Sequence, residues 1–361
     1  MKKTVFTAIL LCLTLSLPVA AQKWEYVEAK DLTLVGKLYP DTPHPYHRLD
    51  TTLCKSGFTA GEINQVTQSA GVAVAFETDS PMIAVCPEYG KISSGGSTAP
   101  ISQKGFDLYI RENGQWLWAG ALTAGENGVT KNILANKKPG ISECLIYFPI
   151  SSSVESLKIG VKEGSVIRPV ENPFRHRIAI FGSSYTHGIS TSRSGMAYPA
   201  QLSRMTGLQF LSLGCSGNSK LQTYFAHALA DAPDIDAFVF DSFSNPSPQM
   251  IEERLFEFIE IIQAKYPDVP LIFQKTIYRE RRNFDTGTDK FEAAKMEMAE
   301  KMMKEACKKY KNVYYITDTC ATAPNHETSV DGTHPGDYGY TLWAESIAKP
   351  IVKILKKYGI K

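Results

Sequence analysis

Two kinds of hydrophobic patterning divide the chain. Up to about residue 172, apolar residues come in short runs of strand length, separated by turns rich in Gly and Pro, with no helical period of useful length. Beyond residue 172, short apolar runs alternate with longer segments of helical period. The pattern therefore predicts an all-β region followed by an α/β region, with a boundary near Pro173.

The all-β region contains a strong hairpin signal. Strand-like runs at 106–111 and 115–121 flank Asn113-Gly114, a dipeptide that favours a tight two-residue turn. Further strand-like runs lie at 72–76, 82–85, 144–148 and 156–161. Short strands joined by such turns are typical of a sandwich or a jelly roll.

The second region alternates five strands with helices. Strands are expected at 178–181, 210–213, 237–240, 271–273 and 313–316, and helices at 196–205, 220–229, 248–265, 289–309 and 336–357. This alternation predicts a doubly wound, flavodoxin-like α/β fold with a parallel five-stranded sheet. In such sheets, ligands bind outside the carboxyl ends of the strands.

The first 21 residues have the pattern of a signal peptide. Lys2 and Lys3 precede an apolar run at 5–17, and small residues at 19–21 form a cleavage site. We therefore predict a signal peptide at 1–21, a β-sandwich domain at 22–172 and an α/β domain at 173–361. The mature protein is expected to be exported, to the periplasm or the cell exterior, without a membrane-inserted segment.

Charge and cysteine content narrow the function classes. Loss of Lys2 and Lys3 leaves the mature chain with a formal charge of about zero, which argues against a nucleic-acid partner. Six cysteines remain, widely spaced and without a CxxC pair, so neither a zinc knuckle nor a redox motif is present. Export permits one or two disulfides, and all fifteen pairings of six cysteines stay open.

Three residues have the chemistry of a nucleophile and its activating groups. Ser184 follows the strand at 178–181, at the predicted carboxyl edge of the sheet. A serine hydroxyl needs a nearby base, and that base needs a third group to orient it. Asp331 and His334 share one turn after the last strand, at the same edge, and can supply both roles.

Two intervening loops carry candidate donors for an oxyanion. Gly217 follows the second strand and can present an unobstructed N–H, and Asn245 follows the third strand and can present its amide. Acyl transfer builds negative charge on a carbonyl oxygen, so donors placed in advance are required. Together with the N–H of Ser184, these residues predict an oxyanion hole.

Four sequence blocks, FGSSYTHG, GCSGN, SNP and DGTH, resemble those of the GDSL-type or SGNH hydrolase superfamily and stand in its usual order. The resemblance spans 177 to about 357 and implies the same roles for Ser184, Gly217, Asn245, Asp331 and His334. The β region is similar to the N-terminal domain of a bacterial GDSL subgroup, which in turn resembles two-domain carbohydrate esterases.

The blocks depart from the family pattern at two places. Ser183 stands where the family has the Asp of its Gly-Asp-Ser, a residue that often tethers the loops. Pro246 follows Asn245 where the family usually has Asp, and it removes a backbone donor. The reacting groups are all present, so the departures concern how the loops are held.

We therefore predict a serine esterase that hydrolyses acyl esters, O-acetyl esters of a glycan in particular, with no cofactor. The alternatives are an acylhydrolase for lipid or aryl esters, an acyltransferase, and an inactive glycan-binding protein. No pair of His, Asp or Glu shows metal-ligand spacing with a third member nearby, so no metal is expected. The substrate is a small-molecule or glycan ester, and the substrate-binding residues and oligomeric state are left open.

Several other histidine, tryptophan, tyrosine and arginine residues lie outside the set of Ser184, Asp331 and His334. His187 lies beside the nucleophile, but His334 already has an orienting partner, so His187 is placed outside the catalytic relay. His44, His47 and Arg48 lie in a Pro-rich segment, 40–49, that can reach a neighbouring site. For Trp24, Trp116 and Trp118, packing in the core is favoured over a sugar-binding face. For Tyr278, Arg279, Arg281 and Arg282, a solvated loop is favoured over an entrance for an acidic sugar.

Overall fold

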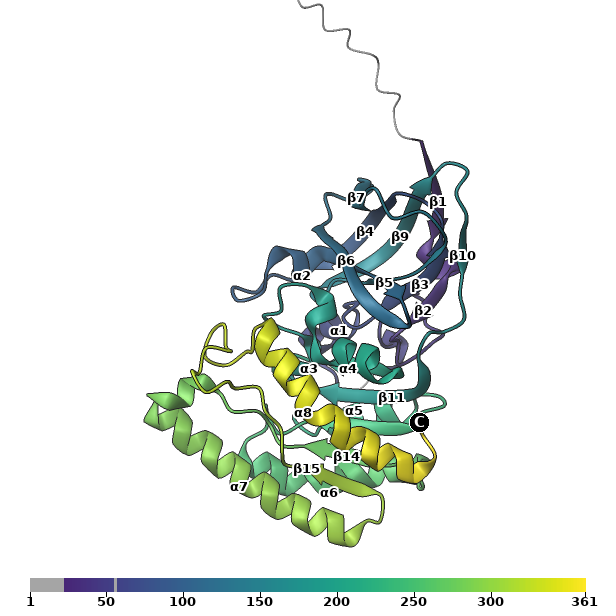
Figure 1. Ribbon diagram of the computed structural model, residues 1–361. Helices are drawn as coiled ribbons and strands as arrows, with labels where there is room; N and C mark the ends of the chain where they lie inside the picture. Colours follow the sequence, from purple (N-terminus) through teal and green to yellow (C-terminus); the bar gives the residue numbers. More distant parts are fainter. Residues whose placement is uncertain (1–22, 55–56) are drawn as a thin grey trace, which may run out of the picture.

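The computed structural model describes residues 23–54 and 57–361, so the predicted signal peptide at 1–21 lies outside the described residues. Figure 1 shows the two regions one above the other, with the strands β1–β10 in the upper half and the alternating strands and helices below. Within the described ranges, no helix is both long and apolar enough to cross a membrane.

The first half is an antiparallel β-sandwich, as predicted. One sheet has the order β1-β9-β4-β7, and the other has β10-β3-β8-β5-β6 with β2 paired to β3. Phe76, Phe106 and Ile159 belong to the core between the two sheets. The strands are β1 (Trp24–Glu28), β2 (Thr33–Val35), β3 (Ala73–Thr78), β4 (Ile83–Ile92), β5 (Gly105–Glu112), β6 (Gln115–Thr123), β7 (Lys131–Leu134), β8 (Ser142–Tyr147), β9 (Ser152–Lys162) and β10 (Ile167–Pro169).

Local signals explain the turns of this half and one helix that the hydrophobic period did not predict. Asn113 and Gly114 both have positive φ and join β5 to β6. The helix α1 (Ala60–Val66) starts at a capping box, in which Thr59 and Glu62 satisfy each other's backbone N–H groups. The remaining helical segments here are α2 (Pro100–Lys104), η1 (Ala29–Asp31) and η2 (Thr51–Leu53).

The second half is the predicted doubly wound α/β fold. Its five strands pair in parallel in the order β12-β11-β13-β14-β15. The strands are β11 (Arg175–Gly182), β12 (Leu208–Gly214), β13 (Ala237–Asp241), β14 (Leu271–Gln274) and β15 (Val313–Ile316). The helices are α3 (Ser184–His187), α4 (Tyr198–Thr206), α5 (Thr223–Ala230), α6 (Pro248–Lys265), α7 (Thr286–Lys309) and α8 (Asp337–Leu355), with η3 (Ser194–Met196), η4 (Glu280–Asn283) and η5 (Lys356–Tyr358).

Alternation along the strands places helices on both faces of the sheet. Ile178 and Ile180 pack with α4 and α8 on one face, and Ala179 and Phe181 pack with α5, α6 and α7 on the other. Figure 1 shows α8 in yellow across the front of this half. The methionines of α7 fill the core as expected, with Met302 and Met303 buried. The α7 helix begins three residues before the predicted start because the Asp285 side chain caps it.

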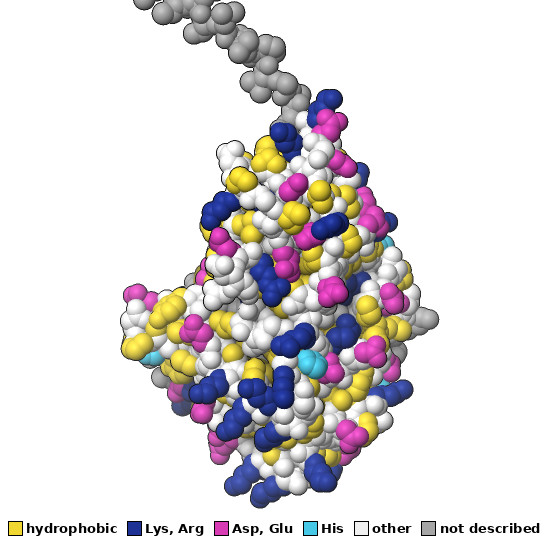
Figure 2. All heavy atoms as spheres, turned by 45° about the vertical axis from the view of Figure 1, so that its right-hand side comes forward, with side chains coloured by type: hydrophobic (Ala, Val, Ile, Leu, Met, Phe, Trp, Pro, Cys, Tyr) yellow, Lys and Arg dark blue, Asp and Glu magenta, His cyan; other side chains and the backbone are white. Residues whose placement is uncertain are grey.

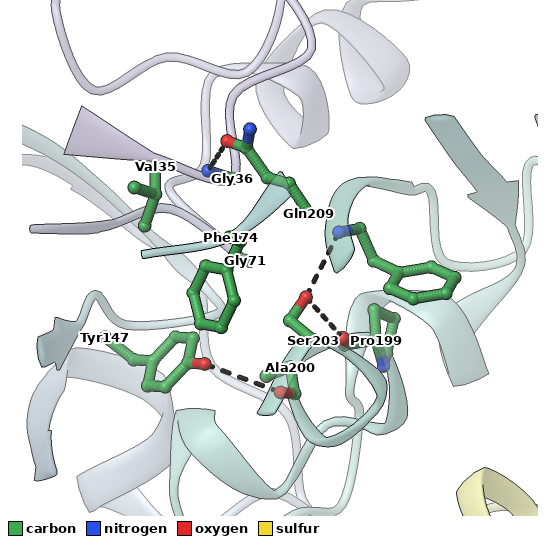
Figure 3. Close-up of a pocket in the computed structure, with 10 residues that line it drawn as sticks. Val35, Gly36, Gly71, Tyr147, Phe174, Pro199, Ala200, Ser203 and Gln209 are labelled. Atoms are coloured by element: carbon green, nitrogen blue, oxygen red, sulfur yellow. Dashed lines mark hydrogen bonds between the residues drawn. The ribbon is translucent and has the colours of Figure 1, made fainter. Parts of the chain in front are cut away.

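The two halves share hydrophobic core and hydrogen bonds. Leu38 and Val66 belong to the same buried cluster as the α5–α7 face of the parallel sheet. The close-up in Figure 3 shows Gln209 accepting a hydrogen bond from the Gly36 N–H, and the Tyr147 hydroxyl donating to the Ala200 carbonyl. The cavity between them has a volume of about 10 Å³, the least that holds one water molecule.

The cysteines, the tryptophans and the surface charges follow the sequence-based predictions to different extents. All six cysteines of the described chain are free, so none of the fifteen pairings is formed. Trp116 is half-buried and packs against a core cluster, Trp24 is half-buried, and Trp118 is 55% exposed, so the expected core placement was wrong for Trp118. In the space-filling view of Figure 2, acidic and basic side chains are interspersed over the upper half, and basic ones gather lower down.

Candidate active site

The nucleophile candidate lies at the end of a buried central strand. β11 ends at Gly182, and the Ser183 side chain caps the short helix α3, which begins at Ser184. Position 182 has no room for a side chain, because a Cβ there would collide with the side chains of Thr186 and Asp241. The chain therefore turns tightly at the carboxyl edge of the sheet and leaves Ser184 with 6% exposure.

The structure brings Asp331 and His334 to this serine. His334 Nε2 lies 2.9 Å from Ser184 Oγ, and His334 Nδ1 lies 2.7 Å from Asp331 Oδ2. A carboxylate only accepts, so Nδ1 carries a proton and donates to Asp331, which leaves Nε2 free to accept from the serine hydroxyl. The Tyr185 ring packs edge-on against the His334 ring, at 5.8 Å between centroids.

The turn around Asp331 keeps that carboxylate ionised. Partial burial acts to raise its pKa, but hydrogen bonds from His334 and Thr333 outweigh burial and lower the pKa of Asp331 to about 2. Both backbone bonds reach Oδ1, from the N–H of Thr333 at 2.9 Å and of His334 at 2.7 Å. The second oxygen, Oδ2, thus stays directed at the imidazole, which is the arrangement that orients a base.

The two oxyanion candidates lie on the neighbouring loops. Gly217 has a φ of 73°, and the space where a Cβ would stand is open. The Oδ1 atom of Asn245 accepts from the Ser219 N–H at 3.2 Å, which leaves the amide NH₂ to donate elsewhere. This bond links the loops after β12 and β13, so the two candidates are positioned together.

A buried carboxylate, Asp241, replaces the tether that is absent at position 183. Its Oδ2 accepts from the Ser183 N–H at 3.2 Å, the Ser183 hydroxyl at 2.7 Å and the Thr186 hydroxyl at 3.1 Å. Burial raises the pKa of Asp241 to about 6, against the effect of these hydrogen bonds. Asp241 ends strand β13, and its role was not predicted, although an Asp at a strand end beside the nucleophile strand was a usable signal.

Behind the Asn245 loop lies a buried charged network. Arg279 donates to the Ser244 carbonyl at 2.8 Å, to the Tyr185 hydroxyl at 2.9 Å and to Glu292 at 2.8 Å. Lys295 donates to the same Ser244 carbonyl at 3.0 Å and pairs with Glu292 at 2.6 Å. Arg279 was expected in a solvated loop, and this was wrong, because its guanidinium supports the loops from behind.

The β half supports the other oxyanion loop. Arg48 is completely buried and donates to the carbonyls of Gly214 and Gln68, at 2.8 and 2.9 Å. Gln65, on α1, donates to the Ser216 carbonyl at 3.0 Å. Residues 214–218 are therefore held by side chains from the Pro-rich segment and from α1, both in the β half, which the order of the sequence does not show.

The remaining candidates lie around the triad without joining it. His187 is buried and donates from Nε2 to the Ile150 carbonyl at 2.7 Å, and burial lowers its pKa to about 3. The Arg281 N–H donates to the Gly332 carbonyl beside Asp331. Tyr278 is 37% exposed, and Arg282 pairs with Asp289. Ser184, His334 and Asp331 thus form a connected hydroxyl, imidazole and carboxylate, an arrangement that can serve acyl transfer.

Two sequence families match consecutive parts of the chain. Residues 175–353 match the GDSL-like lipase/acylhydrolase family, and residues 23–167 match the N-terminus of SGNH-hydrolase-type esterases. Among curated proteins, none matches the chain.

Solved structures resemble the whole chain. A protein from Bacteroides ovatus, described as a GDSL-like lipase, is 37% identical with a TM-score of 0.89, and the match covers 92% of this chain and 98% of that one. The salicylyl-acyltransferase SsfX3 from a tetracycline pathway is 20% identical with a TM-score of 0.71, covering 92% and 97%. A family two carbohydrate esterase from Cellvibrio japonicus is 10% identical with a TM-score of 0.62, covering 93% and 99%. The last two likenesses concern the fold alone.

Proposed function

The chain belongs to the GDSL-like lipase/acylhydrolase family and is an ester-hydrolysing enzyme, and we propose that it is an exported serine esterase that removes O-acetyl groups from carbohydrate. The observation that carries the chemistry is the continuous line of contacts from Ser184 Oγ through His334 to Asp331, at 2.9 and 2.7 Å. These lengths are those of hydrogen bonds that can carry a proton from nucleophile to base.

In the proposed reaction, Ser184 Oγ attacks the ester carbonyl while its proton passes to His334 Nε2. Asp331 stabilises the imidazolium that forms and remains a carboxylate throughout. His334 then protonates the departing alcohol oxygen, which leaves an acyl group on Ser184. Water, deprotonated by the same imidazole, attacks the acyl group and releases the acid and the free serine.

The oxyanion formed in each half of the reaction is assigned to three donors. These are the N–H groups of Ser184 and Gly217 and the side-chain amide of Asn245. The Ser219 bond that occupies Asn245 Oδ1 supports this assignment, because it presents the amide as a donor. Each such donor is worth about 10²–10³ in rate.

The carbohydrate assignment rests on architecture. Family two carbohydrate esterases from Cellvibrio japonicus and Clostridium thermocellum share this fold along most of the chain, with TM-scores of 0.62 and 0.58. Export rests on the pattern of residues 1–21, with Lys2 and Lys3 before the apolar run. An exported enzyme meets acetylated glycans at the cell surface or outside it.

The test is acetate release by the mature protein from acetylated xylan, acetylated sialic acid and p-nitrophenyl acetate, beside the Ser184→Ala variant. We expect release from at least one glycan and none by the variant, whose melting temperature should match that of the wild type because only one buried oxygen is lost. Equal rates for the two proteins would reject Ser184 as the nucleophile. A preference for p-nitrophenyl esters of long acyl chains, without glycan activity, would favour the lipid acylhydrolase.

A further inference from the structure

Three potential metal ligands from distant parts of the chain meet on the β half. His44 and His47 lie in the Pro-rich segment 40–49, with their rings stacked at 4.4 Å between centroids. Glu155, an exposed residue of β9, reaches both of them. His44 Nδ1 is 3.3 Å from Glu155 Oε2, and His47 Nε2 is 3.7 Å from Glu155 Oε1. The ligand atoms of the three residues all lie within 4.8 Å of one another.

One of these atoms is a buried polar atom without a partner. The His47 side chain is only 9% exposed, and its Nε2 has no hydrogen-bond partner. The 3.7 Å to Glu155 exceeds the length of a hydrogen bond. A buried polar atom without a partner is costly and calls for a physical reason. A cation between His47 and Glu155 would supply the missing partner of His47 Nε2.

From this geometry we propose that His44, His47 and Glu155 bind a divalent transition-metal ion of the zinc type. Two imidazoles and one carboxylate form a ligand set that zinc accepts, with a fourth position left for water. Ligands about 2.0–2.1 Å from a tetrahedral ion lie roughly 3.3–3.4 Å apart. The distance from His44 Nδ1 to Glu155 Oε2 is already 3.3 Å. The remaining distances between ligand atoms, all within 4.8 Å, reach this value by small rotations of the His44 and Glu155 side chains, whose ends are exposed.

The surroundings hold the ligands in place. Tyr46 and Arg48, on either side of His47, are both completely buried, so the backbone between them is fixed. A Cβ at position 90 would overlap the Glu155 carboxylate, so Gly90 leaves the space that this carboxylate occupies. The His47 N–H donates to the His44 carbonyl, which closes the turn that stacks the two rings.

The charges around His47 favour its neutral, metal-binding form. Burial lowers the pKa of His47, His44 and Lys37 act in the same direction, and Glu155 acts in the opposite one. Lys37 is the charge that opposes a cation, but its ammonium is directed to the Pro40 carbonyl and the Thr42 hydroxyl, at 2.9 and 2.8 Å. Because metal binding requires neutral imidazoles, affinity should fall as the pH drops.

The test uses the mature protein without a histidine tag, treated with EDTA and then titrated with Zn²⁺ against a chromophoric chelator. We expect one equivalent to bind and to raise the melting temperature, because the ion binds the folded chain preferentially. His44→Ala and Glu155→Gln change exposed or half-exposed side chains and should keep the fold. Loss of an outer partner costs about 10–100-fold, so loss of a ligand should weaken Zn²⁺ binding by at least about 100-fold.

The control is His227→Ala, which removes an exposed histidine on α5 that lies outside the His44, His47 and Glu155 cluster. Its Zn²⁺ affinity should equal that of the wild type. Binding that is absent in the wild type, or that is unchanged in both His44→Ala and Glu155→Gln, would overturn the proposal. Unchanged binding would assign the ion to other groups, such as the exposed thiols of Cys307 and Cys320.

Discussion

At the scale of single residues, the nucleophile turn depends on Asp241. Its Oδ2 receives three hydrogen bonds from Ser183 and Thr186, while its Oδ1 is buried without a partner. The folded chain therefore contains a carboxylate with one oxygen well satisfied and one not, which is why burial prevails and its pKa rises to about 6. Asp241 therefore holds the turn through three hydrogen bonds, while burial disfavours its ionised form.

The pH dependence of stability follows from this pKa. Between about 3.8 and about 6, the folded state binds the Asp241 proton more tightly than the unfolded state, so this residue lowers stability as the pH rises through that window. Asp241→Asn supplies an acceptor for the three donors and removes the charge. Urea unfolding should show the wild type gaining stability relative to the variant, by about 2 kcal/mol, from pH 7.5 to pH 4.5.

The control for this prediction is Asp268→Asn, which changes an exposed carboxylate. It should leave the difference between the two pH values as it is in the wild type. If Asp241→Asn also left that difference unchanged, Asp241 would be ionised in the folded state at both pH values, contrary to the argument.

A second residue-scale prediction concerns Asp331. Asp331→Asn keeps the shape of the turn but presents an amide to His334 Nδ1, which favours the wrong tautomer of the base. We expect kcat for p-nitrophenyl acetate to fall by about 10²–10⁴, with little change in KM. A variant that kept most of its activity would show that another group orients His334.

At the scale of elements, each catalytic loop is supported from behind by a different part of the fold. The Asn245 loop rests on Arg279 and Lys295, which come from the segment after β14 and from α7. The Gly217 loop rests on Arg48 and Gln65, from the Pro-rich segment and α1. Strand ends place the loops at one edge, and these side chains set their conformation.

Because Arg279 supports the Asn245 loop from behind, we predict that replacing Arg279 lowers kcat without weakening substrate binding. Arg279→Lys removes the fork that reaches the Ser244 carbonyl and the Tyr185 hydroxyl together, so the Asn245 amide should shift. Because a displacement of about 1 Å can cost 10²-fold, we expect kcat to fall by about 10–100-fold at similar KM. Arg282→Lys changes an arginine three residues further along the same segment, which pairs with Asp289, and should retain the wild-type kcat.

Equal activity of the Arg279→Lys and wild-type enzymes would show that Lys295 alone holds the loop. Melting temperatures of both arginine variants separate this effect from unfolding. A merely structural role would lower the melting temperature without changing kcat at low temperature.

At the scale of the whole molecule, the two halves are joined by core as well as by hydrogen bonds. One hydrophobic cluster contains Leu38 and Val66 together with residues of α5–α7, and another contains Tyr147 and Ala200. Clusters that cross a boundary couple the stability of its two sides. The halves should therefore unfold together.

The expected result is a single transition in urea. Three of the four tryptophans, Trp24, Trp116 and Trp118, lie in the β half, and the fourth, Trp343, is buried on α8. Fluorescence of a Trp343→Phe variant therefore reports on the β half, whereas its far-UV circular dichroism at helical wavelengths reports mainly on the α/β half. The two curves should coincide within error. Two separated midpoints would show that the shared clusters do not couple the halves.

How much of this protein the sequence alone determined depends on the range of each interaction. The order of strands and helices follows from the local periodicity of hydrophobic residues, so both the sandwich and the parallel sheet were predictable from the sequence. The structure confirms this fold. The turn of Asn113-Gly114 and the missed capping box of Thr59 and Glu62 are also local signals. Strand order places Ser184, Asp331 and His334 at one edge, and their catalytic roles stay a prediction.

Only the tertiary structure decided which groups stand behind those residues. Asp241 beneath Ser183, Arg48 against Gly214, and Glu155 between His44 and His47 each join segments that are far apart in the sequence. The sequence showed no third ligand beside the two histidines, because β9 brings it from far along the chain. A buried charge or carbonyl must find a partner wherever the fold places one, and that choice depends on distances that no local pattern contains.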